Sequence, residues 1–118
     1  MHIMNLKKIN KFVYEIFLNH NLSSKDAKIS AKALINAELV GAHTHGLSRL
    51  AMYCKRIKKK IINPKAKIKI KKISQSIAHI DGNNGIGFVA ADIGIKTAIK
   101  SAKKTGIGLV PNKLFLAP

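Results

Sequence analysis

The stretch AELVGAHTHGLSR, residues 37–49, separates two helix-like patterns and carries the most chemically versatile side chains of the sequence. It places His45, Gly46 and Arg49 within five consecutive positions. If a helix begins at Gly46, His45 and Arg49 lie one turn apart at its N-terminal end. Imidazole exchanges a proton near neutral pH, and guanidinium holds a carboxylate with two parallel hydrogen bonds. The pair therefore predicts a site for a small oxo or hydroxy acid.

The residues before this stretch predict two helices. Residues 6–18 carry apolar side chains at the spacing of one helix face, namely Ile9, Phe12, Val13, Ile16 and Phe17. Ser23 is a typical N-cap, with Asp26 three residues later as in a capping box. The second helix then continues to about Val40, and its predicted buried face consists of Ala27, Ala31, Leu34 and Ile35.

The residues after it predict a third helix and then a small sheet. The third helix spans 47–61, with a seam of Leu47, Leu50, Cys54, Ile57 and Ile61, and it ends at Asn63-Pro64. Period-two alternation predicts a half-buried strand at 67–71, with a neighbouring strand at 77–80. A helix over 88–104 has a predicted apolar stripe of Ala91, Ile95, Ala98, Ile99 and Ala102. It ends at Gly106, which is expected to take a left-handed cap conformation, before a short buried strand at 107–110.

The expected fold class is α+β. Residues 1–62 form an N-terminal three-helix segment that carries the His-Gly-x-Ser-Arg motif. Residues 63–118 form a small sheet with one packing helix, incomplete at its C-terminus.

Four motifs resemble one family in order and spacing. Residues 44–49, Thr-His-Gly-Leu-Ser-Arg, are similar to the Ser-His-Gly-Val-Ser-Arg run of the malate/L-lactate dehydrogenase family, which is unrelated to the Rossmann-type lactate dehydrogenases. Residues 50–64 resemble that family's helix and its exit into an Asn-Pro turn. Residues 81–87 resemble its Asp-Gly-x-x-Gly-x-Gly loop, and residues 106–110 resemble the strand that follows. The resemblance covers about Leu6 to Val110.

The resemblance implies an NAD(P)-dependent oxidoreductase that interconverts a small 2-hydroxy acid and its 2-oxo acid. His45 would be the catalytic acid/base, Arg49 would bind the substrate carboxylate, and Ser48 would assist by a hydrogen bond. NAD or NADP would be the cofactor, although the family's nicotinamide-binding region lies downstream of the part that matches. This chain therefore resembles an N-terminal portion of a larger non-Rossmann fold, expected to be inactive alone. Homo-oligomeric assembly is a further implication.

Two departures from the family pattern stand out. His43 occupies a position where family members carry Asp or a small or aromatic residue, so it cannot replace a carboxylate there. After Val110, family members continue through a run with another histidine, whereas residues 111–118 contain none.

Simpler interpretations stay open for each residue. His45 could merely end a helix, Arg49 could be a surface arginine, and serine is common at helix starts. His43 and His45 together supply only two ligands, so no metal is expected. The loop at 81–87 could expose backbone N–H groups to an anion, but a tight turn with glycine at positive φ is the simpler interpretation.

Composition bounds the alternatives. The 118 residues allow one domain at most, and the net charge of +17 raises a second hypothesis, a small basic domain that binds nucleic acid through the lysine runs. That hypothesis is weakened because only Arg49 and Arg56 are arginines and there is no tryptophan.

Cys54 is the single cysteine, and no segment has the length and apolarity of a signal peptide or a membrane span. A cytoplasmic protein without a membrane anchor is expected. A third hypothesis is that this chain is a non-catalytic remnant that can at most associate with a homologous subunit.

Overall fold

The structure is a computed structural model that describes residues 5–113. The chain divides into two compact units, residues 1–64 and 65–118, and each is described by itself. The described residues combine four α-helices with a three-stranded sheet, so the predicted α+β class is confirmed. No helix among them is long and apolar enough to cross a membrane.

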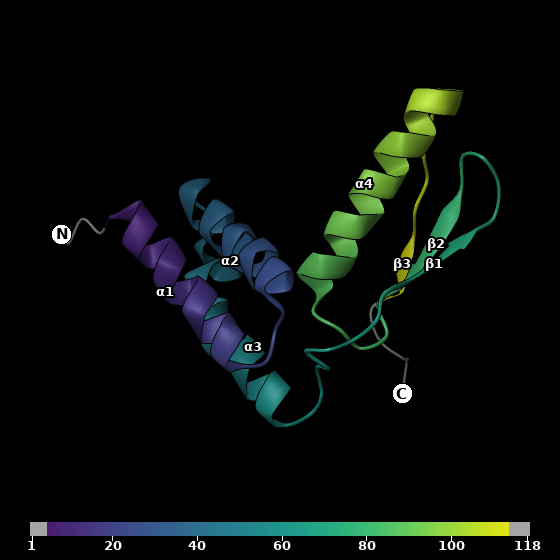
Figure 1. The fold of residues 1–118 in the computed structure, drawn as a ribbon. Coiled ribbons are helices and arrows are strands. Elements are labelled where there is room, and N and C mark those ends of the chain that lie inside the picture. Colours follow the sequence, from purple (N-terminus) through teal and green to yellow (C-terminus); the bar gives the residue numbers. More distant parts are fainter. Residues whose placement is uncertain (1–4, 114–118) are drawn as a thin grey trace. The chain divides into compact units, whose positions relative to one another are not determined.

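The first unit begins with a helical hairpin. Helix α1 spans Leu6–Asn19 and helix α2 spans Ser24–Leu39, and the two pack against each other (Figure 1). The predicted N-cap of α2 is confirmed, because the Ser23 hydroxyl accepts a hydrogen bond of 3.1 Å from the Asp26 N–H. The hairpin core consists of Val13, Phe17, Leu22, Ala27, Ala31, Leu34 and Ile35.

Parts of the predicted apolar faces are exposed in this unit. Phe12 lies at the edge of the α1 face and is 62% exposed. The expected third helix is two elements, a 3-10 turn η2 (Leu47–Arg49) and helix α3 (Leu50–Lys58). Of its predicted seam only Ile57 is buried, while Ile61 is exposed because α3 has already ended.

Helix α3 also ends earlier than the Asn63-Pro64 stop that we predicted. Lys60 takes a left-handed conformation with φ of +61°. The N–H groups of Ile61 and Ile62 both turn back to the carbonyl of Arg56. The backbone therefore leaves the helix before the proline can act on it.

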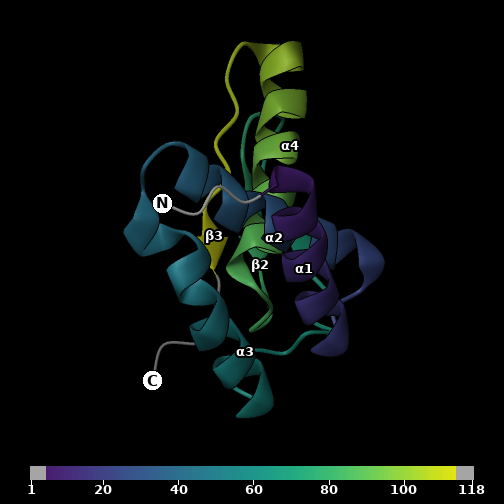
Figure 2. The same cartoon turned by 90° about the vertical axis from the view of Figure 1, so that its left-hand side faces the viewer.

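The second unit is a sheet with one helix on it (Figures 1 and 2). Strands β1 (Lys69–Lys72), β2 (Ala78–Asp81) and β3 (Asn112–Lys113) lie in the order β1-β2-β3. The pair β1–β2 is antiparallel, β2–β3 is parallel, and helix α4 (Gly87–Thr105) connects the parallel strands. Gly106 ends α4 with φ of +87°, which confirms the predicted left-handed cap.

The first strand begins at Lys69, two residues later than predicted, and is more exposed than expected, although Ile68 just before it is half-buried. All four residues of β1 are exposed. Ile70 pairs directly with Ile80, so both point to the same side of the sheet. Ile80 is buried in the central strand whereas Ile70, on the edge strand, is 54% exposed.

The last predicted strand is displaced. Leu109 forms only an isolated bridge with Ile77, and β3 begins at Asn112. Ile107 and Leu109 are exposed rather than buried. The chain passes close to α4 at this point, since a Cβ at Gly108 would collide with the carbonyl oxygen of Ala98. The departure at residues 111–118 lies mostly outside the described residues.

Helix α4 turns a different face to the sheet from the one predicted. Its buried residues are Val89, Ala90 and Gly94. A Cβ at Gly94 would lie 2.9 Å from the side-chain oxygen of Asn112, so glycine permits a close approach. The predicted stripe is therefore wrong as a buried face, and Ile95 and Ile99 are 58% and 48% exposed.

Candidate active site

The candidate site lies where α2 ends and the chain turns toward α3. The N–H of Gly41 donates to the carbonyl of Glu38, and the N–H of Ala42 donates to that of Ala37. Gly41 has φ of +81°, a conformation that glycine takes without a steric penalty. Two short 3-10 turns follow, η1 (His43–His45) and η2, with Gly46 between them.

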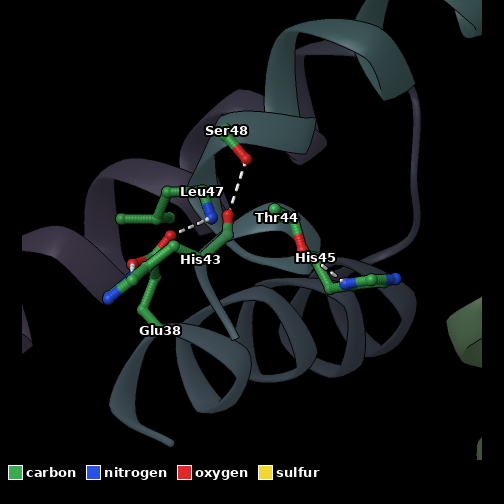
Figure 3. Close-up of polar contacts among 6 residues, drawn as sticks. All are labelled: Glu38, His43, Thr44, His45, Leu47 and Ser48. Carbon is green, nitrogen blue, oxygen red and sulfur yellow. Dashed lines mark hydrogen bonds and ion pairs between the residues drawn. The ribbon is translucent and has the colours of Figure 1, made fainter. Parts of the chain in front are cut away.

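Glu38 holds these two turns together (Figure 3). Its Oε1 accepts a 2.8 Å hydrogen bond from the N–H of Leu47, the first residue of η2. Its Oε2 lies 2.5 Å from Nδ1 of His43, the first residue of η1. One carboxylate at the end of α2 therefore bridges both turns and fixes the path of the junction.

The pKa of the Glu38 carboxyl is lowered from its ordinary value of 4.5. The largest cause is the hydrogen bond with the His43 side chain, followed by the hydrogen bond from the Leu47 N–H. Both contacts favour the charged form of the carboxylate. The Glu38 carboxylate is consequently charged at neutral pH.

Gly46 is required by this carboxylate. A Cβ at position 46 would collide with the Glu38 side chain, and Gly46 is itself buried. Close packing against the Glu38 side chain thus accounts for the glycine that follows His45.

His45 and Arg49 both contact Thr44. Nδ1 of His45 lies 2.9 Å from the Thr44 hydroxyl, and Nε of Arg49 donates a 2.6 Å hydrogen bond to the Thr44 carbonyl. Both side chains are exposed. The ring of His45 extends away from the Glu38 carboxylate, with its second nitrogen at the outer end (Figure 3). The two residues thus share an anchor, although the single helix expected to begin at Gly46 is two separate turns.

Ser48 has a partner within the junction. Its hydroxyl donates a 2.7 Å hydrogen bond to the carbonyl of His43, as Figure 3 shows. This bond ties η2 back to η1. The Ser48 oxygen can still accept a hydrogen bond from another molecule.

Sequence reasoning missed Glu38. His43 was expected to leave the position without the charge that an Asp would supply, yet His43 pairs with a carboxylate five residues earlier. A signal was present, because the chain has only five acidic residues and one of them stands just before the His-x-His-Gly run. No group of three or more potential metal-binding side chains occurs in residues 5–113.

The loop at 81–87 lies in the second unit and is a turn. Asn83 and Asn84 take positive φ values of 49° and 57°, so the expectation that its glycines do so is wrong. Gly85 is needed instead for close packing, because a Cβ there would lie 2.8 Å from the Cβ of Ala66.

Three backbone N–H groups of this loop are hydrogen-bonded within the chain. Gly82 donates to the carbonyl of Lys113, Asn83 to the Asp81 carboxylate, and Gly85 to the carbonyl of Gly82. An anion site at a loop needs several N–H groups directed outward. These three N–H groups are therefore not available to an anion.

Comparisons with known proteins agree along the whole described chain. The sequence matches the family described as malate/L-lactate dehydrogenase over residues 4–113. It is 35% identical over 111 residues to the L-sulfolactate dehydrogenase of Methanocaldococcus jannaschii, which is 94% of this chain and 32% of that protein. It is 40% identical over 99 residues to a malate dehydrogenase of Pyrococcus abyssi, covering 84% of this chain and 27% of that protein.

A solved structure gives the same result. The malate dehydrogenase of Entamoeba histolytica superposes with a TM-score of 0.88 at 36% identity, over 96% of this chain and 33% of that one. The chain thus spans about a third of the length of these relatives. With a family match across residues 4–113 and the same fold in a solved relative, the chain belongs to the malate/L-lactate dehydrogenase family.

Proposed function

We propose that this chain contributes the substrate-binding part of an NAD(P)-dependent oxidoreductase that interconverts a small 2-hydroxy acid, of the malate or lactate type, and its 2-oxo acid. The observation that carries the proposal is the pair His45 and Arg49, both exposed and both anchored on Thr44. The relatives support it, since they are named malate and L-sulfolactate dehydrogenases. We further propose that the protein acts in the cytoplasm as a homo-oligomer.

His45 is the proposed acid/base. The contact of Nδ1 with the Thr44 hydroxyl orients the ring, and the outer nitrogen is the atom that faces a substrate. When the 2-oxo acid is reduced, this nitrogen gives a proton to the developing alkoxide; in the reverse direction it removes the proton from the hydroxyl. An imidazole can act both as a proton donor and as a proton acceptor.

Arg49 is the proposed carboxylate-binding residue. Its Nε is held by the Thr44 carbonyl, so the two terminal nitrogens of the guanidinium are the ones that face a substrate carboxylate. Ser48 would assist as a hydrogen-bond acceptor, because its proton is directed to the His43 carbonyl.

NAD or NADP would supply the hydride. By resemblance, the nicotinamide-binding region lies downstream of the part that matches, so we assign no residue of this chain to the cofactor. The relatives are about three times as long as the part that they share with this chain. We therefore expect no NADH-dependent reduction of oxaloacetate or pyruvate by this chain alone.

A chimera tests the proposal. The matching 99 residues of the Pyrococcus abyssi malate dehydrogenase are replaced by the corresponding part of this chain, and NADH oxidation with oxaloacetate is followed. In the active chimera His45→Ala should lower kcat by about 10²–10⁴-fold, because proton transfer typically contributes that much. His79→Ala changes an exposed histidine on β2 and serves as the control. Unchanged kcat in the His45→Ala chimera would show that this histidine is structural.

The same chimera tests Arg49. Arg49→Lys keeps the charge but loses the two-pronged grip on a carboxylate. We expect a rise in KM for oxaloacetate of at least about tenfold with a smaller change in kcat. Arg56→Lys, on the exposed side of α3, is the matched control. Equal effects of the two changes would argue against substrate binding by Arg49.

A further inference from the structure

A groove of about 570 Å³ runs between α1 and α2, apart from the junction that carries His45. It is open to the surface rather than enclosed. At the end where the two helices are joined, the Tyr14 hydroxyl lies 3.0 Å from the Ser24 hydroxyl. Toward the other end the groove reaches Leu6 and Leu39, which are the first residue of α1 and the last residue of α2.

The groove combines an apolar floor with a basic rim. Leu6, Ile35 and Leu39 supply the apolar surface, and Leu6 and Leu39 are 49% and 63% exposed. The rim carries two lysines from each helix, each pair four residues apart, namely Lys7 and Lys11 on α1 and Lys28 and Lys32 on α2. None of the described residues that line the groove is acidic.

We propose that this groove binds an amphipathic helix of a partner polypeptide, with apolar residues along one face and acidic residues on both sides of that face. A helix laid between two helices buries its apolar face on the floor. Its flanking carboxylates then meet the lysines that stand on either side. Binding would bury the exposed Leu6 and Leu39 and would place carboxylates beside the four lysines of the rim.

The charge and shape of the groove disfavour other occupants. The same face of a second copy would bring four more lysines to this groove, so a homo-oligomer would use another face. Single-stranded nucleic acid stacks its bases on aromatic side chains, and Tyr14 is the single aromatic residue among the described lining residues. A small anion would leave most of the apolar floor exposed.

A peptide titration tests the proposal. The probe is a synthetic helix of about 16 residues made of Ala, Leu and Glu, with leucines at alternating spacings of three and four and glutamates beside them. Binding to the isotopically labelled full chain is followed by NMR. We expect micromolar affinity at physiological salt, with amide shifts concentrated at α1 and α2. A peptide of the same composition with its leucines dispersed around the helix should bind at least about tenfold more weakly.

Matched variants separate the groove from general attraction to a basic protein. Lys28→Glu with Lys32→Glu should weaken binding at least about tenfold. Lys58→Glu with Lys59→Glu makes the same change in net charge at the end of α3 and should leave affinity within about twofold. Leu39→Ser should weaken binding without a change in charge.

Several results would overturn the proposal. These are absence of binding, equal binding of the dispersed peptide, equal effects of the two lysine pairs, or shifts centred on α3 or β1. Dimerisation of the free chain through the groove, or displacement of the helical peptide by single-stranded DNA from α1 and α2, would assign the groove to another occupant.

Discussion

At the scale of single residues, one carboxylate organises the junction. Glu38 receives the Leu47 N–H and contacts His43, and its position makes glycine necessary at 46. The position of His45 follows from this arrangement, because the turn that carries it begins at His43 and ends at His45, just before Gly46. A residue with no proposed chemical role therefore positions the one proposed to transfer the proton.

The junction should loosen in acid. The pKa of Glu38 is lowered, so its contribution to stability is present above the ordinary value of 4.5 and is lost as pH falls through the lower folded value. Carbon NMR of the carboxyl group should show a midpoint below 4.5, with the Leu47 amide shifting in parallel. In His43→Ala the midpoint should rise, because the largest cause of the shift is removed. An unchanged midpoint in that variant, as expected for His79→Ala, would contradict this account.

At the scale of elements, size decides which helix face is buried. Helix α4 carries large apolar residues on one side, such as Ile95 and Ile99, and small ones on another, such as Ala90 and Gly94. The small face lies on the sheet, where Asn112 approaches Gly94 closely. Apolar periodicity ranks faces by hydrophobicity and does not measure how closely a strand can approach.

Helix α3 depends on a single deeply buried side chain. Ile57 is 7% exposed and is the one buried residue of α3. Ile57→Ala should reduce the free energy of unfolding by about 2–4 kcal/mol, because the substitution removes buried apolar atoms and leaves a cavity in their place. Lys59→Ala, at an exposed position just after α3, should cost less than about 1 kcal/mol. Urea denaturation measures both, and equally small losses would mean that this face of α3 is not packed.

At the scale of the whole molecule, the net charge of +17 is spread over both units as lysine. Such a protein attracts any polyanion without reading its sequence. The exposed lysines of β1, Lys69, Lys71 and Lys72, lie on a strand whose four residues are all exposed. This distribution favours non-specific attraction over a shaped interface for nucleic acid.

Binding to duplex DNA should accordingly be weak and blind to sequence. Fluorescence anisotropy with two unrelated duplexes should give affinities within about twofold of each other. Affinity should fall steeply between about 50 and 200 mM salt, because counterion release drives such binding. A sub-micromolar complex at physiological salt that prefers one duplex would instead favour the basic nucleic-acid-binding alternative.

The sequence alone was sufficient for the local features and for the family. Helices α1, α2 and α4, the Ser23 and Gly106 caps and two neighbouring strands near β1 and β2 follow from periodicity and end signals, which depend on neighbours within a few residues. The antiparallel direction of that strand pair was found only in the structure. The family followed from four motifs in register. The roles of His45, Ser48 and Arg49 stay predictions.

The tertiary structure decided those features that depend on contacts beyond the immediate sequence neighbours. The face that α4 buries depends on Asn112, eighteen positions after Gly94. The exposure of Ile70 depends on the edge position of β1. The role of Glu38 depends on the chain folding back so that Leu47, nine residues later, meets its carboxylate. In each case packing of the chain decides which residues or strands lie close together. The spacing of residues along the sequence does not give these distances in space.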